Sequence, residues 1–463
     1  MSRVAVIDIG KTNAKLALVD LDDMSEIAVV TRPNTVRPGP PWPHFDLEGH
    51  WEFLLDGLAA FHRAHGIDAI SVTTHGASIV LLDKTGRLAA PMLDYEHDGP
   101  DEVRESYDAL RPDFAETGSP RLPAGLNVGA QLHWMLKQDP GLRDRIATVV
   151  TYPQYWGFRL TGVAATDCTS LGCHTDLWVP SEARLSALPE RLGLGARFAP
   201  TRAPSEVLGP LLPQVAARTG LPAATPVHCG IHDSNASLLP HVLGRKPPFS
   251  VVSTGTWVVC MGMGGTPVTL DPKRDTLINV NALGDPVPSA RFMGGRAFDL
   301  LCGAAAVQPS TDDLDSILAP PVLLLPAVVP GSGPYPDRSA EWIGPEPPTG
   351  SGARTAAASL YLALMTAECL DLIGHNGTVV VAGPFARNDA FCKLLSVATE
   401  SPVARSVGAT GTSQGAALLA TGARAAPRMV KAERHSCDRM QSYARAWRDA
   451  VAAQSVRTSR SAS

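Results

Sequence analysis

The sequence lacks the features that mark nucleic-acid-binding, membrane or disulfide-rich proteins. Its 463 residues include only eight cysteines, and no two of them form a Cys-x-x-Cys pair. The net charge is -5, so no broad basic surface is expected and nucleic acid is excluded as the main partner. No apolar run approaches the length that spans a membrane, which argues against a membrane partner.

The cysteines are scattered, and the nearest pair, Cys168 and Cys173, is followed by His174. Three such side chains can bind a metal, but no second cluster completes a site. We interpret the cysteines as isolated buried thiols, which fit a reducing cytosol. The N-terminus has no basic segment before an apolar one, so we expect no signal peptide and a cytoplasmic protein.

The hydrophobic content of 44% is that of a globular chain, and 463 residues are too many for one core. We therefore predict two large domains, with the boundary at Pro247 and Pro248. The predicted division is an N-terminal lobe at 1–245, a C-terminal lobe at 246–455 and a disordered tail at 456–463.

The stretch at residues 4–20, VAVIDIGKTNAKLALVD, predicts a strand, a tight turn and a second strand. Gly10 tolerates a positive φ and leaves room beside the backbone. Lys11, Thr12, Asn13 and the free N–H groups of the turn suit phosphate oxygens. Asp8, at the end of a buried strand, is placed to hold a hydrated Mg²⁺. An ordinary hairpin with a glycine turn is the alternative.

Hydrophobic periodicity and turn residues predict the remaining elements. Helices are expected at 46–65, 101–110, 129–138, 214–218, 353–372, 389–400, 415–420 and 438–453, and strands at 26–31, 68–72, 79–83, 227–230, 378–382 and 403–407. Residues 148–160 predict a helix entered from a strand, and residues 305–347 are expected to be mainly loop.

A second strand-turn-strand pattern at 250–261, SVVSTGTWVVCM, repeats the plan of the first. Its turn, made of Ser253, Thr254, Gly255 and Thr256, offers hydroxyl and N–H groups to phosphate. Together with Lys11-Thr12-Asn13, this turn would hold the two ends of a triphosphate. Asp233 lies between a strand and a helix, where it is the best candidate for a base that accepts a hydroxyl proton. The alternative for Asp233 is an N-cap residue.

Five segments in this order resemble the FGGY carbohydrate kinases, most closely the L-fuculokinase and rhamnulokinase branches of that family. The segments are DIGKTN, VTTHGAS, GIHDSNASL, SVVSTGTW and VVVAGPFARND. The resemblance runs from about Val4 to Ala420, with a poor match between Ala305 and Gly352. It implies an α/β, two-lobed, actin-like (ribonuclease-H-like) ATPase fold with an interlobe cleft.

The resemblance also implies roles for individual residues. Asp233 would be the catalytic base and, with Asp8, would hold Mg²⁺. ATP would be bound by Lys11, Thr12, Asn13, Ser253, Thr254, Gly255, Thr256, Gly383 and Asn388. The sugar would be bound by His75, Gly76, Tyr95 and Asp233. The segment Gly383-Pro384-Phe385 departs from the consecutive glycines of the family's adenosine loop, and Gln131 stands where the family usually has lysine.

The sugar-site residues have alternatives of their own. A lone histidine such as His75 is more often a packed or surface residue, although its place in a polar turn after a strand is typical of binding residues. Tyr95 and Trp257 are equally suited to a core. The polar cluster at 94–98 could touch the sugar or be solvated.

The predicted function is an ATP- and Mg²⁺-dependent kinase for a ketose or deoxyketose: L-fuculose, L-rhamnulose, D-ribulose or D-xylulose. A polyol or aldose kinase is an alternative within the class. The rivals from other classes are a chaperone-like ATPase or sensor of actin fold and a sugar-responsive repressor, which would need a DNA-binding helix pair before Val4. The expected partner is a small sugar, and a homodimer is possible by family resemblance.

Overall fold

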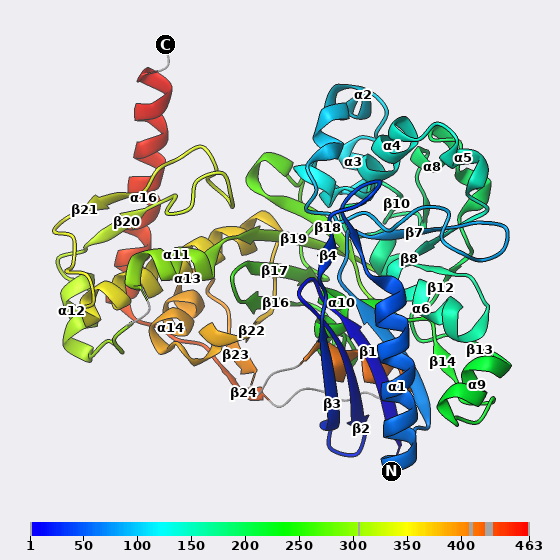
Figure 1. Cartoon of the computed structure of the whole chain (residues 1–463). Helices are drawn as coiled ribbons and strands as arrows, with labels where there is room; N and C mark the ends of the chain where they lie inside the picture. Colours follow the sequence, from blue (N-terminus) through cyan, green and yellow to red (C-terminus); the bar gives the residue numbers. More distant parts are fainter. Residues whose placement is uncertain (1, 304–305, 407–410, 422–428, 462–463) are drawn as a thin grey trace. The chain divides into compact units, whose positions relative to one another are not determined.

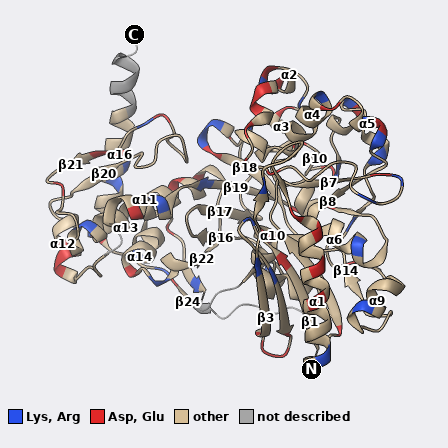
Figure 2. Cartoon of the chain, in the orientation of Figure 1, with Lys and Arg blue, Asp and Glu red and all other residues tan. Residues whose placement is uncertain are grey.

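A computed structural model describes residues 2–303, 306–406, 411–421 and 429–461. The chain divides into two compact units (Figure 1). Unit 1 comprises Met1–Arg245, Ile278–Pro286 and Thr410–Ala426. Unit 2 comprises Lys246–Leu277, Val287–Ala409 and Pro427–Ser463. Acidic and basic residues are interspersed on the drawn side of each unit (Figure 2), in keeping with the small net charge.

The sheet of unit 1 is built around β1, whose side chains from Val4 to Ile7 are all buried. In strand order the sheet contains β13 (Val207–Gly209), β14 (Val227–His228), β6 (Ala69–Thr74), β1 (Arg3–Ile9), β2 (Asn13–Asp20) and β3 (Ser25–Pro33), and β15 (Ile231–His232) also pairs with β6. Strands β1, β2 and β3 are antiparallel neighbours, whereas β6 runs parallel to β1. The carboxyl ends of β1 and β6 therefore lie at the same edge.

Helices cover both faces of this sheet. Helix α1 (Leu47–His65) begins after Asp46, whose carboxylate accepts the Gly49 N–H, and ends at Gly66 with φ 78°. Its apolar face packs on one side of the sheet together with α6 (Tyr152–Thr161) and α9 (Pro213–Thr219). Helices α10 (Asp233–Gly244) and α15 (Thr412–Ala417) cover the other side. At Gly415 the helices touch so closely that a side chain would overlap the Ala236 backbone.

A separate hydrophobic cluster in unit 1 joins shorter elements around Trp42, Tyr107 and Trp134. The short helices of this part of unit 1 are η1 (Gly99–Val103), α2 (Arg104–Asp108), α3 (Phe114–Thr117), η2 (Ala124–Leu126), α4 (Val128–Gln138), α5 (Leu142–Arg145), α7 (Cys168–Leu171), α8 (Leu188–Arg191) and η3 (Gly195–Arg197). Short strand pairs accompany them: β4 (Val36–Arg37) with β5 (His44–Phe45), β7 (Ile79–Leu82) with β8 (Thr148–Thr151), β9 (Thr166–Asp167) with β12 (Thr201–Arg202), and β10 (Trp178–Val179) with β11 (Arg184–Leu185).

The sheet of unit 2 has the same plan. It contains β18 (Thr276–Val280), β19 (Pro286–Phe292), β17 (Val258–Met263), β16 (Phe249–Thr254), β22 (Thr378–Ala382), β23 (Val403–Ser406) and β24 (Met429–Glu433), in this order. Strands β16, β17 and β19 are antiparallel neighbours, and β22 and β23 continue in parallel from β16. Each sheet thus joins an antiparallel strand group to parallel strands through its first strand.

The core of unit 2 is organised by α13 (Gly352–Leu372). This helix is long and apolar enough to cross a membrane, but 83% of its most apolar window is buried inside the protein. Around it lie α11 (Gly294–Cys302), α12 (Thr311–Leu318), α14 (Asp389–Ala398) and α16 (Asp438–Ser461). The remaining elements of unit 2 are η4 (Pro272–Arg274), the pair β20 (Leu323–Leu325) and β21 (Glu341–Ile343), and η5 (Pro384–Arg387), whereas η6 (Leu418–Ala420) follows α15 in unit 1.

The expected strands and most of the expected helices are present, with ends shifted by a few residues. Residues 306–347 are mainly loop, as expected, but they also contain α12, β20 and β21, which were not predicted; residue 305 lies outside the described residues. The start of α12 carries a capping box between Ser310 and Asp313. The expected helix at 101–110 is instead η1 followed by α2.

Two features differ from the predicted domain division. The contact-based boundary falls between Arg245 and Lys246, but Ile278–Pro286 and Thr410–Ala426 belong to unit 1, not to the C-terminal unit. Residues 412–417 form α15, which packs on β1, so a packed helix and not chain order assigns them to unit 1. At the C-terminus, α16 runs to Ser461 where a tail was expected from 456, and residues 462–463 lie outside the described residues.

Candidate functional site

The turn between β1 and β2 leaves backbone N–H groups free. The Gly10 N–H donates to the Asn13 carbonyl (2.9 Å), which closes the turn. Among the described residues, the N–H groups of Lys11 and Thr12 have no hydrogen-bond partner. The Asn13 amide donates to the Thr12 hydroxyl (3.2 Å), and both side chains are exposed. The turn therefore presents donors and a hydroxyl group to solvent, as phosphate binding requires.

A buried polar chain supports this turn from beneath. The Asn34 side-chain amide donates to the Gly10 carbonyl (2.8 Å), and its oxygen lies 2.8 Å from His50 Nε2. Arg32 donates to His50 Nδ1 (2.8 Å), so Nε2 carries the proton that bonds to Asn34. Burial, followed by the Arg32 charge, lowers the pKa of His50 to about 4. His50 is fully buried and neutral at pH 7, and it fixes the position of Asn34.

Asp8 lies at the end of β1, where α15 anchors one oxygen of its carboxylate. Asp8 Oδ2 accepts from the hydroxyls of Thr412 (2.5 Å) and Ser413 (2.7 Å), and Lys15 Nζ is 3.4 Å away. Among the described residues, Oδ1 has no hydrogen-bond partner. The second oxygen is thus open to a ligand such as a metal-bound water.

Lys11 extends from the turn to a pair of carboxylates. Its ammonium group forms a close ion pair with Asp94 and lies 3.1 Å from Glu96 Oε2. It also lies over two aromatic rings, 4.7 Å from the centroid of Tyr95 and 5.2 Å from that of Phe45. The predicted phosphate-binding side chain is therefore already paired with negative charge.

His75 follows β6 and stands inside an aromatic ring of neighbours. Its ring centroid lies 5.2 Å from those of Phe45 and Tyr95 and 5.0 Å from that of Tyr152. Nδ1 bonds to the Gly76 carbonyl (2.9 Å), whereas Nε2 is buried without a partner among the described residues. Burial lowers the pKa of His75, so the imidazole is neutral. A buried ring nitrogen without a partner is suited to a ligand hydroxyl.

Asp233 is the first residue of α10 and is held by His232. The His232 Nε2 lies 3.1 Å from Asp233 Oδ1, and the Ser234 N–H donates to the same oxygen (2.6 Å). Burial raises the pKa of Asp233, but the His232 charge and hydrogen bond outweigh burial, and the pKa lies below its ordinary value. The carboxylate is ionised at pH 7 and is 29% exposed. It can accept a proton from a bound hydroxyl group.

Gly76, which follows His75, has to be a glycine because His232 packs against it. A side chain at Gly76 would come within 2.6 Å of His232 Nε2. His232 is in turn backed by Cys173, whose sulfur lies 3.9 Å from Nε2. The N-cap position of α10 is occupied by His232, and Asp233 is the first residue inside the helix. The sequence-based alternative of Asp233 as an N-cap residue is therefore wrong.

Tyr95 joins the Asp233 and Lys11 neighbourhoods. Burial raises the pKa of Tyr95 well above its ordinary value, and the negative charges of Glu96, Asp233 and Asp94 raise it further. Its carbonyl accepts the Gly125 N–H (3.0 Å), which places the 118–127 segment against it. The structure thus brings Lys11, His75, Gly76, Tyr95 and Asp233 into one neighbourhood.

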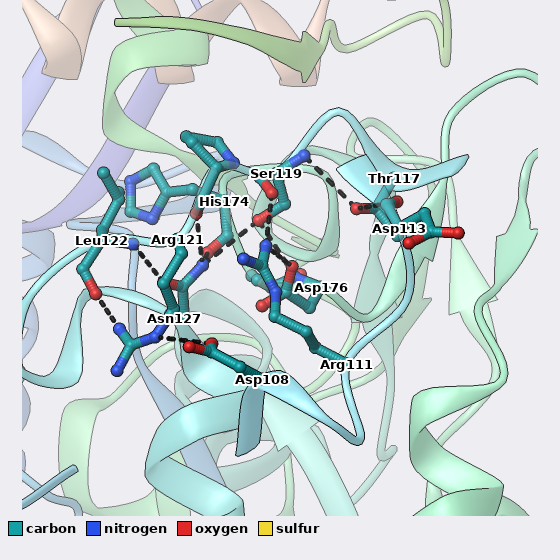
Figure 3. A network of polar contacts seen from close by, with 12 residues as sticks. Asp108, Arg111, Asp113, Thr117, Ser119, Arg121, Leu122, Asn127, His174 and Asp176 are labelled. Atoms are coloured by element: carbon teal, nitrogen blue, oxygen red, sulfur yellow. Dashed lines mark hydrogen bonds and ion pairs between the residues drawn. The ribbon is translucent and has the colours of Figure 1, made fainter. Parts of the chain in front are cut away.

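A polar network holds the 118–127 segment in place (Figure 3). At its centre, Asn127 accepts the Leu122 N–H (2.8 Å) and donates to the His174 carbonyl (3.1 Å). Arg111 bridges the Ser119 carbonyl (2.6 Å) and the buried carboxylate of Asp176 (2.7 Å). The network fixes the segment that supports Tyr95. No local motif in the sequence indicated it, since its members come from distant positions.

In unit 2, the predicted second turn follows β16. The Gly255 N–H donates to the Trp257 carbonyl (3.0 Å), and the Thr256 carbonyl accepts the Gly295 N–H (3.1 Å). The Thr256 side chain is exposed, and that of Ser253 is half-buried. Thr254 is turned inward, where its hydroxyl donates to the Ala382 carbonyl (2.6 Å). Thr254 has a supporting position, and the exposed groups of the turn come from its neighbours.

Thr254 connects this turn to Gly383. Its hydroxyl accepts the Phe385 N–H (3.1 Å), and Gly383 lies directly against its carbonyl with φ 88°. Phe385 is buried between Phe298 and Phe391, so it packs in the core beneath the turn. Asn388 caps α14 by accepting the Phe391 N–H (3.0 Å). The segment Gly383-Pro384-Phe385, which lacks the family's consecutive glycines, thus leads into a short 3₁₀ helix, η5, whose Phe385 side chain is buried.

The described residues contain no group of three or more histidine, cysteine or acidic side chains that could hold a metal directly. All eight cysteines are unpaired, and seven are buried. Sequence reasoning did not find the residues that support the turns: Asn34, His50, Thr412, Ser413 and His232. Each acts through a contact that has no local sequence signal, except His232, which is next to Asp233.

Two units with one strand plan, each with a polar turn after its first strand, have the two-lobed actin-like (ribonuclease-H-like) ATPase fold. Two family domains match the sequence: "FGGY family of carbohydrate kinases, N-terminal domain" at residues 4–240, and "Carbohydrate kinase FGGY, C-terminal domain" at residues 246–428. The chain belongs to the FGGY family of carbohydrate kinases.

Individual relatives support the family and the fold. A solved carbohydrate kinase from Novosphingobium aromaticivorans is 38% identical, with a TM-score of 0.89 over 96% of this chain and 100% of that one. A xylulose kinase from Rhodospirillum rubrum shares the fold at 23% identity and a TM-score of 0.78, over 98% of both chains. L-fuculokinase of Escherichia coli K12 is 26% identical over 273 residues, 56% of each chain. The chain spans about half the length of the curated relatives it matches.

Proposed function

We propose that this protein is an ATP-dependent kinase that transfers the γ-phosphate to a hydroxyl group of a ketose or deoxyketose. The observation that carries the proposal is the pairing of an ionised, partly exposed Asp233 with the partnerless Nε2 of His75 in one neighbourhood. A base and a hydrogen-bonding group for the acceptor are what phosphoryl transfer to a sugar needs from the protein.

In this mechanism Asp233 accepts the proton of the attacking hydroxyl group. His232 keeps the Asp233 carboxylate ionised. Because it bonds to Oδ1, it also fixes the orientation of the carboxylate. His75, Gly76 and Tyr95 would bind the sugar, with His75 Nε2 accepting a hydrogen bond from a sugar hydroxyl, because Nδ1–H donates to the Gly76 carbonyl. The buried Asn127 network would keep Tyr95 in place.

The phosphate groups of ATP would be bound by the two turns. In unit 1 the free N–H groups of Lys11 and Thr12 and the Asn13 amide are available. In unit 2 the hydroxyl groups of Ser253 and Thr256 are available, Gly255 would leave room for the phosphate beside the backbone, and Thr254 supports the turn. Gly383 and Asn388 would line the adenosine end. Anion binding by backbone N–H groups of such turns is a general property of phosphate sites.

Mg²⁺ fits Asp8 through water. One oxygen of Asp8 is fixed by α15 and the other has no partner among the described residues, so the carboxylate is oriented and still available. Mg²⁺ keeps several waters and needs only one or two carboxylates, such as Asp8 and Asp233. The ion would neutralise phosphate charge.

The choice of acceptor rests on the relatives and is proposed at the level of sugar class. The matched relatives are named as kinases of L-fuculose, rhamnulose, xylulose and L-xylulose/3-keto-L-gulonate. We further propose a cytoplasmic location, in line with the unpaired cysteines. A homodimer remains a prediction.

The proposal is tested by ADP release from MgATP with a panel of acceptors. The panel contains L-fuculose, L-rhamnulose, D-ribulose, D-xylulose, L-xylulose, 3-keto-L-gulonate, glycerol and one aldose. Asp233→Asn should retain nucleotide binding and lose at least about 10³-fold in kcat. The matched control is Asp113→Asn, an exposed carboxylate of unit 1, which should be unchanged. Normal turnover by Asp233→Asn would refute the assigned role.

The second candidate function is an actin-fold nucleotide-binding protein without kinase activity. Tight ATP binding with no acceptor-stimulated ADP release across the panel would favour it. Lys11 gives this candidate some support, because its ammonium is paired with Asp94 and Glu96 and not free for phosphate.

A further inference from the structure

The Lys11 ammonium group shares its surroundings with the proposed acceptor-binding residues. It lies over Tyr95 and Phe45, and these are the same two rings that flank His75. Although Lys11 belongs to the β1–β2 turn, its charged end is thus directed to the side chains around His75. The charge beside the acceptor is set by Lys11 and the groups paired with it.

Asp94 is fixed by the backbone independently of Lys11. Its N–H donates to the Pro43 carbonyl (2.9 Å), and its carboxylate accepts the Glu96 N–H (3.2 Å) as well as Lys11. The Asp94 side chain is 11% exposed, so little solvent screens its charge. A carboxylate held in this way keeps its position when a ligand arrives.

The local charge is negative in balance. Asp94 and Glu96 both face the single ammonium group of Lys11, and Asp233 has His232 as its own partner. An acceptor with a carboxylate group would meet two carboxylates and a lysine that is already paired. An uncharged sugar can instead donate hydroxyl hydrogens to Asp94 and accept from Lys11 without breaking the pair.

We propose that the Lys11–Asp94 pair sets the charge class of the acceptor, with Asp94 rejecting sugar acids and admitting uncharged polyhydroxy ketoses. The inference rests on the proposed kinase function and deepens it. Rejection by an unfavourable charge is a common source of specificity. The competing explanation is that the pair only ties the β1–β2 turn to the 94–97 turn, which would make it indifferent to acceptor charge.

The test compares the best uncharged ketose of the panel with 3-keto-L-gulonate. Asp94→Asn keeps an oxygen for the Glu96 N–H but removes the charge and leaves Lys11 paired with the more exposed Glu96 alone. It should raise the kcat/KM ratio of the anionic to the uncharged acceptor about tenfold. The matched control, Asp98→Asn, removes a 91% exposed carboxylate of the same loop and should change this ratio less than about twofold.

Lys11→Gln distinguishes acceptor binding from phosphate binding by the Lys11 ammonium group. It also replaces Asp94→Asn as the test if that variant fails to fold. It should raise KM for the uncharged acceptor several-fold and leave KM for ATP within about twofold. The reverse pattern would assign Lys11 to phosphate and overturn the inference, as would an unchanged acceptor ratio in Asp94→Asn or a wild-type preference for 3-keto-L-gulonate. A wild-type protein silent on the whole panel would instead overturn the proposed function, and the inference with it.

Discussion

The buried histidine beneath the first turn gives a quantitative prediction. His50→Phe retains a planar ring and removes both ring nitrogens, so the Asn34 oxygen and one Arg32 N–H lose their partner. An unsatisfied buried polar group costs about 1–3 kcal/mol, and Arg32 is partly open to water. We therefore expect His50→Phe to lower the free energy of unfolding by about 2–4 kcal/mol at pH 7.5.

The pH dependence identifies the cause. The pKa of His50 is about 4 in the folded chain against an ordinary value of 6.5. Between these values the unfolded chain binds a proton that the folded chain does not, so folded stability decreases as the pH falls from 6.5 to 4. The full loss is about 3 kcal/mol. His50→Phe lacks this pH-dependent contribution. The difference in free energy of unfolding between the variant and the wild type should therefore be about 2.5 kcal/mol smaller at pH 4.5 than at pH 7.5.

The measurement is urea unfolding of both proteins at pH 7.5, 5.5 and 4.5, followed by tryptophan fluorescence. Trp156 reports locally, because its ring lies 6.5 Å from that of His50. His65→Phe, the same substitution at an exposed position of α1, is the control and should cost less than about 0.5 kcal/mol at pH 7.5. A deficit of His50→Phe that stays constant with pH would refute a buried neutral His50.

The remaining predictions concern unit 2. Gly383→Ala should lower the free energy of unfolding by at least about 2 kcal/mol more than Gly350→Ala. Both glycines have positive φ, but only Gly383 lies against the Thr254 backbone. Equal decreases in Tm for the two variants in thermal denaturation would contradict this packing. Asn388→Ala should cost about 1–2 kcal/mol by removing the cap of α14, and Asn388→Asp, which can still accept the Phe391 N–H, should recover about half or more of it in the same denaturation assay. No difference between the two Asn388 variants would contradict the capping role.

The two glycine turns were predictable because their signals are local. Two mostly apolar runs, a glycine between them and three polar residues after it suffice to predict a hairpin with free donors. The second turn repeats the pattern at β16 and β17. The helix from Leu47 to His65 was predictable for the same reason, since Asp46 and Gly66 mark its ends.

The capping box at Ser310 was also a local signal, yet it was missed within a segment rich in proline and glycine. The helix α12 shows that a cap and an apolar face can form a helix there once the segment packs on the unit 2 core. The tail after residue 455 had no apolar periodicity to indicate the helix that the structure continues to Ser461.

The two strand-turn-strand motifs, the order of the elements and the presence of Asp233 at the start of a helix follow from local sequence, because residues near in sequence decide these features. The tertiary structure alone decided which charges meet. Lys11 reaches Asp94, Asp8 is held by Thr412 and Ser413, and His50 supports Gly10 through Asn34. These pairs join positions far apart in the chain, and only the packing of strands and helices brings them within hydrogen-bonding distance.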